Sequence, residues 1–157
     1  QIMADCLKTN HFHFLLKEIT EGGISKFMQR LATGYTGYFN KKYERVGHLF
    51  QGSFKAVEIR GDSQLHYIIA YINAINPGQE LEPALKSVAQ DPEEILRFIE
   101  HYPWSTHLEY LGERESIIVE KGIAGELFST PKAYRDFIRD IISGKQRLSF
   151  DTTYTFE

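Results

Sequence analysis

One stretch organises this chain, and it reads Thr9-Asn10-His11-Phe12-His13-Phe14-Leu15-Leu16-Lys17-Glu18, the pattern of a β-strand. Side chains alternate along a strand, so His11 and His13 point the same way, with their Cα atoms about 7 Å apart. Phe12, Phe14 and Leu16 point the other way, and we expect them to enter a core. Two imidazoles on one face could converge on one cation. The alternative is a strand whose exposed face carries two histidines, because His-x-His is a short and unspecific pattern.

Length and composition indicate a single soluble domain. The chain has 157 residues, of which 42% are hydrophobic and 25% charged, which is enough for a hydrophobic core. The single Cys6 excludes an internal disulfide and fits a reducing compartment. No apolar run approaches the ~20 residues that a membrane span needs. We therefore expect a cytoplasmic protein that does not bind a membrane.

The formal net charge of −3 is not that of a typical nucleic-acid binder, but the charges are unevenly distributed. Residues 26–60 hold seven lysines and arginines against two glutamates, an excess of five positive charges. Such a local surface can bind phosphates even when the whole chain is acidic. A solvated helix and loop face is the alternative. The candidate DNA-binding residues from this region are Lys41, Lys42, Arg45 and Lys55.

The segments around the His-x-His stretch predict an α+β fold. Residues 2–7 predict an incoming strand, and apolar residues at three- and four-residue intervals predict a helix over 24–39. We expect Tyr35 and Tyr38 of this helix to lie in the core. Residues 47–59 predict a further strand, on which Lys55 could contact a phosphate.

A second helix begins near Asp62 and carries a buried stripe of Leu65, Ile68, Ile69 and Ile72. At 100° per residue, Tyr71 falls roughly 120° from that stripe, at the flank, where a phenol can reach a partner. Asn76-Pro77-Gly78 ends the helix.

The rest of the chain predicts two more helices. One begins at Asp91-Pro92, and the other begins with Thr130 as cap and Pro131 in its first turn. Trp104 is expected to pack in the core. The tail from Lys145 to Glu157 has no clear pattern.

Several segments resemble, in order, the single-tyrosine HUH transposases, which comprise the IS200/IS605-type transposases and the REP-associated tyrosine transposases. The resemblance covers about residues 4–112 well and 113–143 weakly. It is carried by Asn10–Glu18, Ile24–Asn40, Gly47-His48-Leu49-Phe50-Gln51-Gly52, Tyr71-Ile72-Asn73-Ala74-Ile75-Asn76-Pro77 and Tyr102–Gly112. The chain departs from the family pattern by one extra residue between Tyr71 and Asn76, which puts a metal role of Asn76 in doubt more than the role of Tyr71.

The resemblance implies a ferredoxin-like HUH fold, an antiparallel sheet with packed helices. We expect residues 1–112 to carry this domain without the family's usual first strand and helix. Residues 113–157 would be its C-terminal helical extension and tail.

The resemblance also implies the reaction: cleavage and rejoining of single-stranded DNA near a hairpin through a 5′-phosphotyrosine. Tyr71 would be the nucleophile, and His11, His13 and Asn76 would hold Mg²⁺ or Mn²⁺. Two imidazoles favour Mn²⁺ or later transition metals over Mg²⁺. The partner would be a single-stranded DNA hairpin, with a homodimer left open.

Other assignments remain open from sequence. Tyr67, one turn before Tyr71, is the main rival nucleophile, and His48 and His66 could be extra ligands. A truncated or domesticated relative that binds hairpins without cutting is the first alternative function. The second is an unrelated metal hydrolase, which would need carboxylate ligands that no cluster at a matching spacing supplies.

Overall fold

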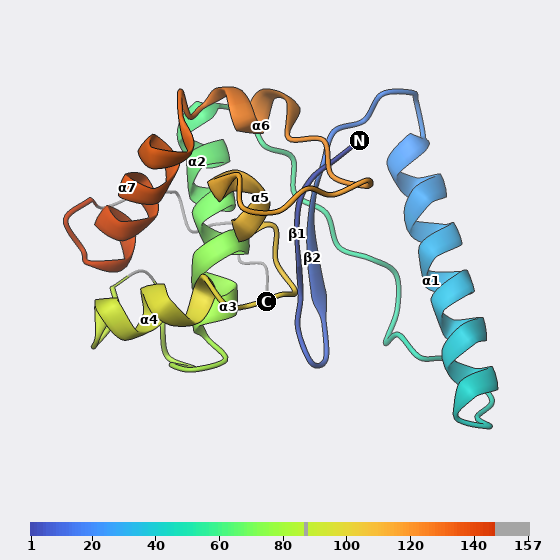
Figure 1. Ribbon diagram of the computed structural model, residues 1–157. Helices are drawn as coiled ribbons and strands as arrows, with labels where there is room; N and C mark the ends of the chain where they lie inside the picture. The colour runs from blue at the N-terminus through green and yellow to red at the C-terminus, as the bar shows by residue number, and fades with distance from the viewer. Residues whose placement is uncertain (87, 147–157) are drawn as a thin grey trace. The chain divides into compact units, whose positions relative to one another are not determined.

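The computed structural model describes residues 1–86 and 88–146 (Figure 1). The chain forms two compact units, which are described separately below. Among the described residues, unit 1 comprises 1–16, 59–86 and 88–146, and unit 2 comprises 17–58. None of the helices in the described ranges combines the length and apolar character needed to cross a bilayer.

The architecture is α+β, as the sequence predicts, with one two-stranded antiparallel sheet among the described residues. In chain order the elements are β1 (Ile2–Leu7), β2 (Phe12–Leu16), α1 (Gly23–Lys42), α2 (Asp62–Ala70), the π-helical turn η1 (Tyr71–Ile75), α3 (Asn76–Gly78), α4 (Pro92–Ile99), α5 (His107–Leu111), α6 (Gly122–Glu126) and α7 (Pro131–Ile142). Helix α1 belongs to unit 2, and the other elements belong to unit 1.

The strand pair presents one buried face to the helices of unit 1. Cys6 pairs with His13 and Ala4 pairs with Leu15, with an irregularity between Ile2 and Ala4 that shifts the register by one residue. Ala4, Cys6 and Leu15 are buried. The expectation that the Phe12 side of β2 faces the core is therefore wrong, because Phe12 is only half-buried and the buried face is the one shared by His13 and Leu15.

Helices α2 and α3 and the turn between them form one continuous helix over residues 62–78. Inside it, the backbone N–H of Asn76 donates to the carbonyl of Tyr71, five residues back. A π-helical turn of this kind contains one residue more than the α-helical turn it replaces. Such a turn would accommodate the extra residue that the resemblance implies between Tyr71 and Asn76.

The turn η1 is the centre of unit 1. It contacts both strands on one side and α4 and α7 on the other. Figure 1 shows the α2–α3 helix in green between the strand pair and α7 in red. Apolar side chains therefore surround it, and the predicted stripe of Leu65, Ile68, Ile69 and Ile72 is buried.

The predicted starts of α4 and α7 are confirmed. The Asp91 side chain accepts from the backbone N–H of Glu94, and Thr130 accepts from the N–H of Ala133, each ahead of a proline. Both bonds satisfy donors that a helix start leaves free. Tyr134 is fully buried on the inner face of α7.

Three further expectations are wrong. Residues 47–59, including Lys55, form no regular strand. Tyr35 and Tyr38 are 49% and 59% exposed on α1, and Trp104 is 60% exposed. Apolar periodicity identifies the element, but it does not show that a partner covers each apolar residue.

Gly78 allows α3 to pack closely on its neighbours. A Cβ at Gly78 would lie 2.6 Å from Leu85 Cδ2 and 3.2 Å from Ile95 Cγ2, both of which are buried. Gly37 in α1 is helical too, but a Cβ there would meet nothing within 4 Å.

We therefore expect Gly78→Ala to lower the free energy of unfolding by about 1–3 kcal/mol through overpacking. Gly37→Ala is the matched control and should raise it by up to about 1 kcal/mol, because alanine favours a helix. Chemical denaturation of both variants measures the difference. Equal effects of the two substitutions would contradict the close packing of α3.

Candidate active site

The two histidines meet at the start of the second strand. His11 directly precedes β2 and His13 lies within it. Their ring centroids are 5.1 Å apart and the rings are perpendicular. Strand alternation places them on one side as expected.

A neighbouring amide determines which nitrogen of His11 is available. Nδ1 of His11 lies 2.6 Å from Oδ1 of Asn10. An amide oxygen only accepts, so Nδ1 carries the proton in this contact and Nε2 keeps its lone pair. Hydrogen bonds of this kind orient metal-binding imidazoles in proteins.

His13 is held in its neutral form. Burial, then the nearby His11 and Lys8, lowers the pKa of His13 to about 4. Its Nε2 is buried and has no hydrogen-bonding partner among the described residues. A neutral imidazole with an unpartnered nitrogen is the form that binds a metal ion.

Tyr71 contacts this pair from the helix. It is the first residue of η1, and its ring centroid lies 5.4 Å from that of His13 at an interplanar angle of 82°. Tyr67, one turn earlier, stacks on Tyr71 with centroids 6.0 Å apart and planes 18° apart. Burial raises the pKa of Tyr67. The structure thus brings His11, His13, Tyr67 and Tyr71 together.

Asn76 is the other end of the π-helical turn. Its side chain is fully buried, and neither its amide oxygen nor its amide nitrogen has a hydrogen-bonding partner among the described residues. Because η1 closes with a bond from Asn76 to Tyr71, these residues lie roughly one above the other along the helix. An amide oxygen and two imidazoles are donors that divalent cations accept.

Two imidazole nitrogens and one amide oxygen would suit a divalent ion by their chemistry. Within the described ranges, no three His, Cys, Asp or Glu side chains gather in a way that would hold a metal ion. A third protein ligand next to His11 and His13 would thus come from a residue of another type, such as Asn76.

Lys8 places a positive charge close to the histidines. Its ammonium lies 3.4 Å from Glu80 Oε1 and 3.3 Å from Gln79 Oε1. These contacts join the β1–β2 turn to the segment after α3. The ammonium contributes to the lowered pKa of both His11 and His13.

The candidate DNA-binding residues all lie in unit 2 and are exposed. The ammonium of Lys42 lies 5.7 Å from the ring of Tyr38 and 5.3 Å from that of Tyr43. The Arg45 guanidinium lies 5.6 Å from the ring of Phe39. Aromatic rings therefore accompany two of the four cations.

The other histidines take no part in this cluster. His48 is exposed in unit 2. His66 contacts the Asp62 carbonyl and the rings of Phe128 and Phe137. Within the described part of unit 1, the contacts of His66 are thus with its own helix and these two rings rather than with the His11–His13 pair.

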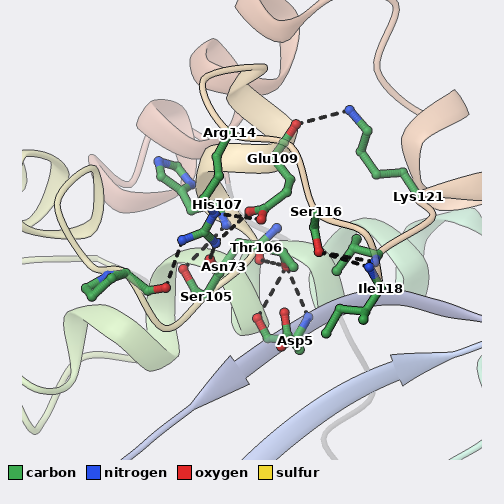
Figure 2. Close-up of polar contacts among 12 residues, drawn as sticks. Asp5, Asn73, Ser105, Thr106, His107, Glu109, Arg114, Ser116, Ile118 and Lys121 are labelled. Atoms are coloured by element: carbon green, nitrogen blue, oxygen red, sulfur yellow. Dashed lines mark hydrogen bonds and ion pairs between the residues drawn. The ribbon is translucent and has the colours of Figure 1, made fainter.

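A buried polar network behind the site was not expected from sequence (Figure 2). Thr106 contacts Asn73 at 2.7 Å, and His107 contacts the Tyr134 hydroxyl at 2.7 Å. Burial, then the charge of Arg135, lowers the pKa of His107 to about 4. Thr and Asn at these positions carry no periodic signal, so only the fold shows that they meet.

The His13 environment predicts a titration. The folded pKa lies below the ordinary value of 6.5, so the unfolded chain binds a proton first as pH falls. The stability that a neutral His13 supports is present above about pH 6.5 and is lost as pH falls toward about 4. We expect the His13 imidazole to titrate near pH 4 in a metal-free NMR series. A midpoint at or above 6.5 would contradict the burial of this ring.

The segment that contains His11, His13 and Tyr71 also matches a known protein family. The family model described as "Transposase IS200 like" matches residues 1–74, a segment that contains His11, His13 and Tyr71 and stops short of Asn76. No curated protein matches the chain, and no solved structure matches it. Residues 1–74 are thus similar to the IS200-like transposase family.

Proposed function

We propose that this protein cleaves and rejoins single-stranded DNA through a covalent phosphotyrosine at Tyr71. The contact of the Tyr71 ring with His13, 5.4 Å between centroids, is the observation that supports this proposal most. The match to the transposase family supports DNA as the substrate and transposition as the process.

The reaction follows from the chemistry of a phenol. The Tyr71 oxygen attacks the phosphorus of a phosphodiester, and an O–P bond forms as the bond from phosphorus to the 3′-oxygen breaks. The phenol proton passes to water, and the 3′-oxygen takes up a proton to leave a 3′-hydroxyl. One hard substitution thus becomes two easier ones.

Rejoining is the reverse attack. A 3′-hydroxyl attacks the phosphotyrosine, the O–P bond to Tyr71 breaks, and the phenol regains its proton. The bond energy is kept in the phosphotyrosine, so neither step needs a nucleotide cofactor.

His11, His13 and Asn76 are the residues that would hold a divalent ion, Mg²⁺ or Mn²⁺. Such an ion, when bound, polarises a phosphate oxygen and offsets its charge. Around it, the Asn10 amide orients His11, and burial keeps His13 neutral. Tyr71 is then the neighbouring nucleophile.

The proposed substrate is a single-stranded DNA hairpin. In unit 2, Lys41, Lys42, Arg45 and Lys55 are exposed cations that would bind its phosphates. The aromatic rings beside Lys42 and Arg45 add surfaces on which bases can stack.

The central test compares Tyr71→Phe with Tyr67→Phe. Each removes one hydroxyl from adjacent stacked rings. With Mn²⁺ and a labelled hairpin oligonucleotide, the wild type and Tyr67→Phe should form a covalent adduct on a denaturing gel. Tyr71→Phe should form none, while its affinity for the oligonucleotide stays within about twofold of the wild type because the aromatic ring remains.

Other outcomes of this test would indicate a different nucleophile or a different function. An adduct that persists in Tyr71→Phe but disappears in Tyr67→Phe assigns the nucleophile to Tyr67. A wild type that binds hairpins and never forms an adduct indicates a DNA-binding relative that does not cut. Cleavage without any covalent product would indicate a hydrolase.

The metal assignment predicts a separate binding result. His13→Ala should weaken Mn²⁺ binding by at least about tenfold, because it removes a ligand. His101→Ala is the control, since His101 is exposed and its ring Nδ1 contacts the Arg97 carbonyl of its own helix turn. Electron paramagnetic resonance of free Mn²⁺ gives both affinities. Unchanged Mn²⁺ binding in His13→Ala would rule out this ligand.

A further inference from the structure

Tyr71 and the histidines reach each other from separate elements, so something must hold those elements in register. His13 is tied to β1, because it pairs with Cys6 across the sheet. Tyr71 belongs to η1, which packs on β1. Apolar packing alone does not specify how far a helix slides along a strand. A directional hydrogen bond between β1 and η1 would specify the position of the helix along the strand.

Thr106 supplies that bond (Figure 2). Its hydroxyl oxygen accepts from the backbone N–H of Asp5, in β1, at 3.0 Å. The same hydroxyl donates to Oδ1 of Asn73, in η1, at 2.7 Å. One side chain thus spans the strand next to His13 and the turn that begins at Tyr71.

The hydroxyl has one proton, and its geometry assigns that proton to Asn73. The other acceptor in reach, the Asp5 carbonyl, is 3.3 Å away and already accepts from the backbone N–H of Thr106 at 3.0 Å. The shorter contact to Asn73 is the stronger bond. Thr106 is 1% exposed and Asn73 is fully buried, so water does not compete for either group.

Thr106 is itself held firmly. The carbonyl of Thr106 accepts from the N–H of Tyr110 at the start of α5. Arg114 donates to the carbonyls of Ser105 and Pro103, and it makes a two-bond ion pair with the buried Glu109 at 2.6 and 2.7 Å. The loop that carries Thr106 is therefore anchored independently of η1.

We propose that Thr106 is a positioning residue that sets the distance between Tyr71 and the His13 strand. This inference rests on the proposed function, since it concerns the same nucleophile. Loss of the hydroxyl leaves the Asp5 N–H and the Asn73 oxygen without their bonds, and both groups are removed from water. The turn then shifts or loosens, and a displacement of about 1 Å at a reacting group can cost about a hundredfold in rate.

The test uses Thr106→Val, which keeps shape and removes the hydroxyl, and Thr106→Ser, which keeps the hydroxyl. Ser105→Ala is the matched control, because Ser105 is equally buried and its hydroxyl contacts only the N–H of His107 in this structure. In single-turnover adduct formation at saturating Mn²⁺ and oligonucleotide, Thr106→Val should be slower by about tenfold or more. Thr106→Ser and Ser105→Ala should stay within about threefold of the wild type.

A second measurement is independent of activity. In the metal-free protein, amide hydrogen exchange in residues 71–75 should rise in Thr106→Val, while exchange in α4 stays unchanged. Thr106→Ser should restore protection. A loss of protection spread evenly over unit 1 would show general destabilisation and would overturn a positioning role.

Different results would refute the proposed function and the positioning role of Thr106. A wild type that forms no adduct refutes the proposed function. A wild type that forms the adduct, with Thr106→Val equally fast or with Thr106→Ser as slow as Thr106→Val, refutes the positioning role alone. An equal loss of oligonucleotide affinity and rate in Thr106→Val also refutes it, because positioning acts on the chemical step.

Discussion

The bond from the Asn76 N–H to the Tyr71 carbonyl is the constraint on which unit 1 depends. It widens one turn of the helix over residues 62–78, and that turn contacts the strands, α4 and α7. An α-helical turn at this place would leave Tyr71 and Asn76 about 140° apart around the axis, whereas the π-helical turn brings them to one side. A single backbone bond thereby places Asn76 on the same side of the helix as Tyr71, whose ring contacts His13.

The core of unit 1 also encloses several polar side chains. Asn73, Asn76, Thr106 and Glu109 are all buried. Burial, then the Glu109 carboxylate, raises the pKa of Asp5 to about 6, although Arg114 opposes the shift. Removing such groups from water costs free energy unless bonds replace the lost hydration. Most of these groups bond to one another, and the amide of Asn76 is an exception.

The sequence predicts part of this architecture, because local geometry determines some features and long-range contacts determine others. The strands at 2–7 and 12–16 and the tyrosine at the flank of its helix follow from periodicity, which local geometry enforces. Periodicity could not show that Leu15 rather than Phe14 faces the core, since both faces of this strand carry apolar residues and only its packing in the fold decides between them. The Thr106–Asn73 bond joins residues 33 positions apart and leaves no local signature. The assignment of catalytic and metal-binding roles stays a prediction, as does the division at residue 112.

The widened turn has a consequence for how related chains are found. An inserted residue in a regular helix rotates everything after it by about 100° and would move Asn76 and Pro77 away from their neighbours. A π-helical turn confines the insertion to a few residues and leaves the flanking segments in phase. A search that demands a constant interval between tyrosine and asparagine would pass over such chains, so motif definitions for this helix should allow the interval to vary by one.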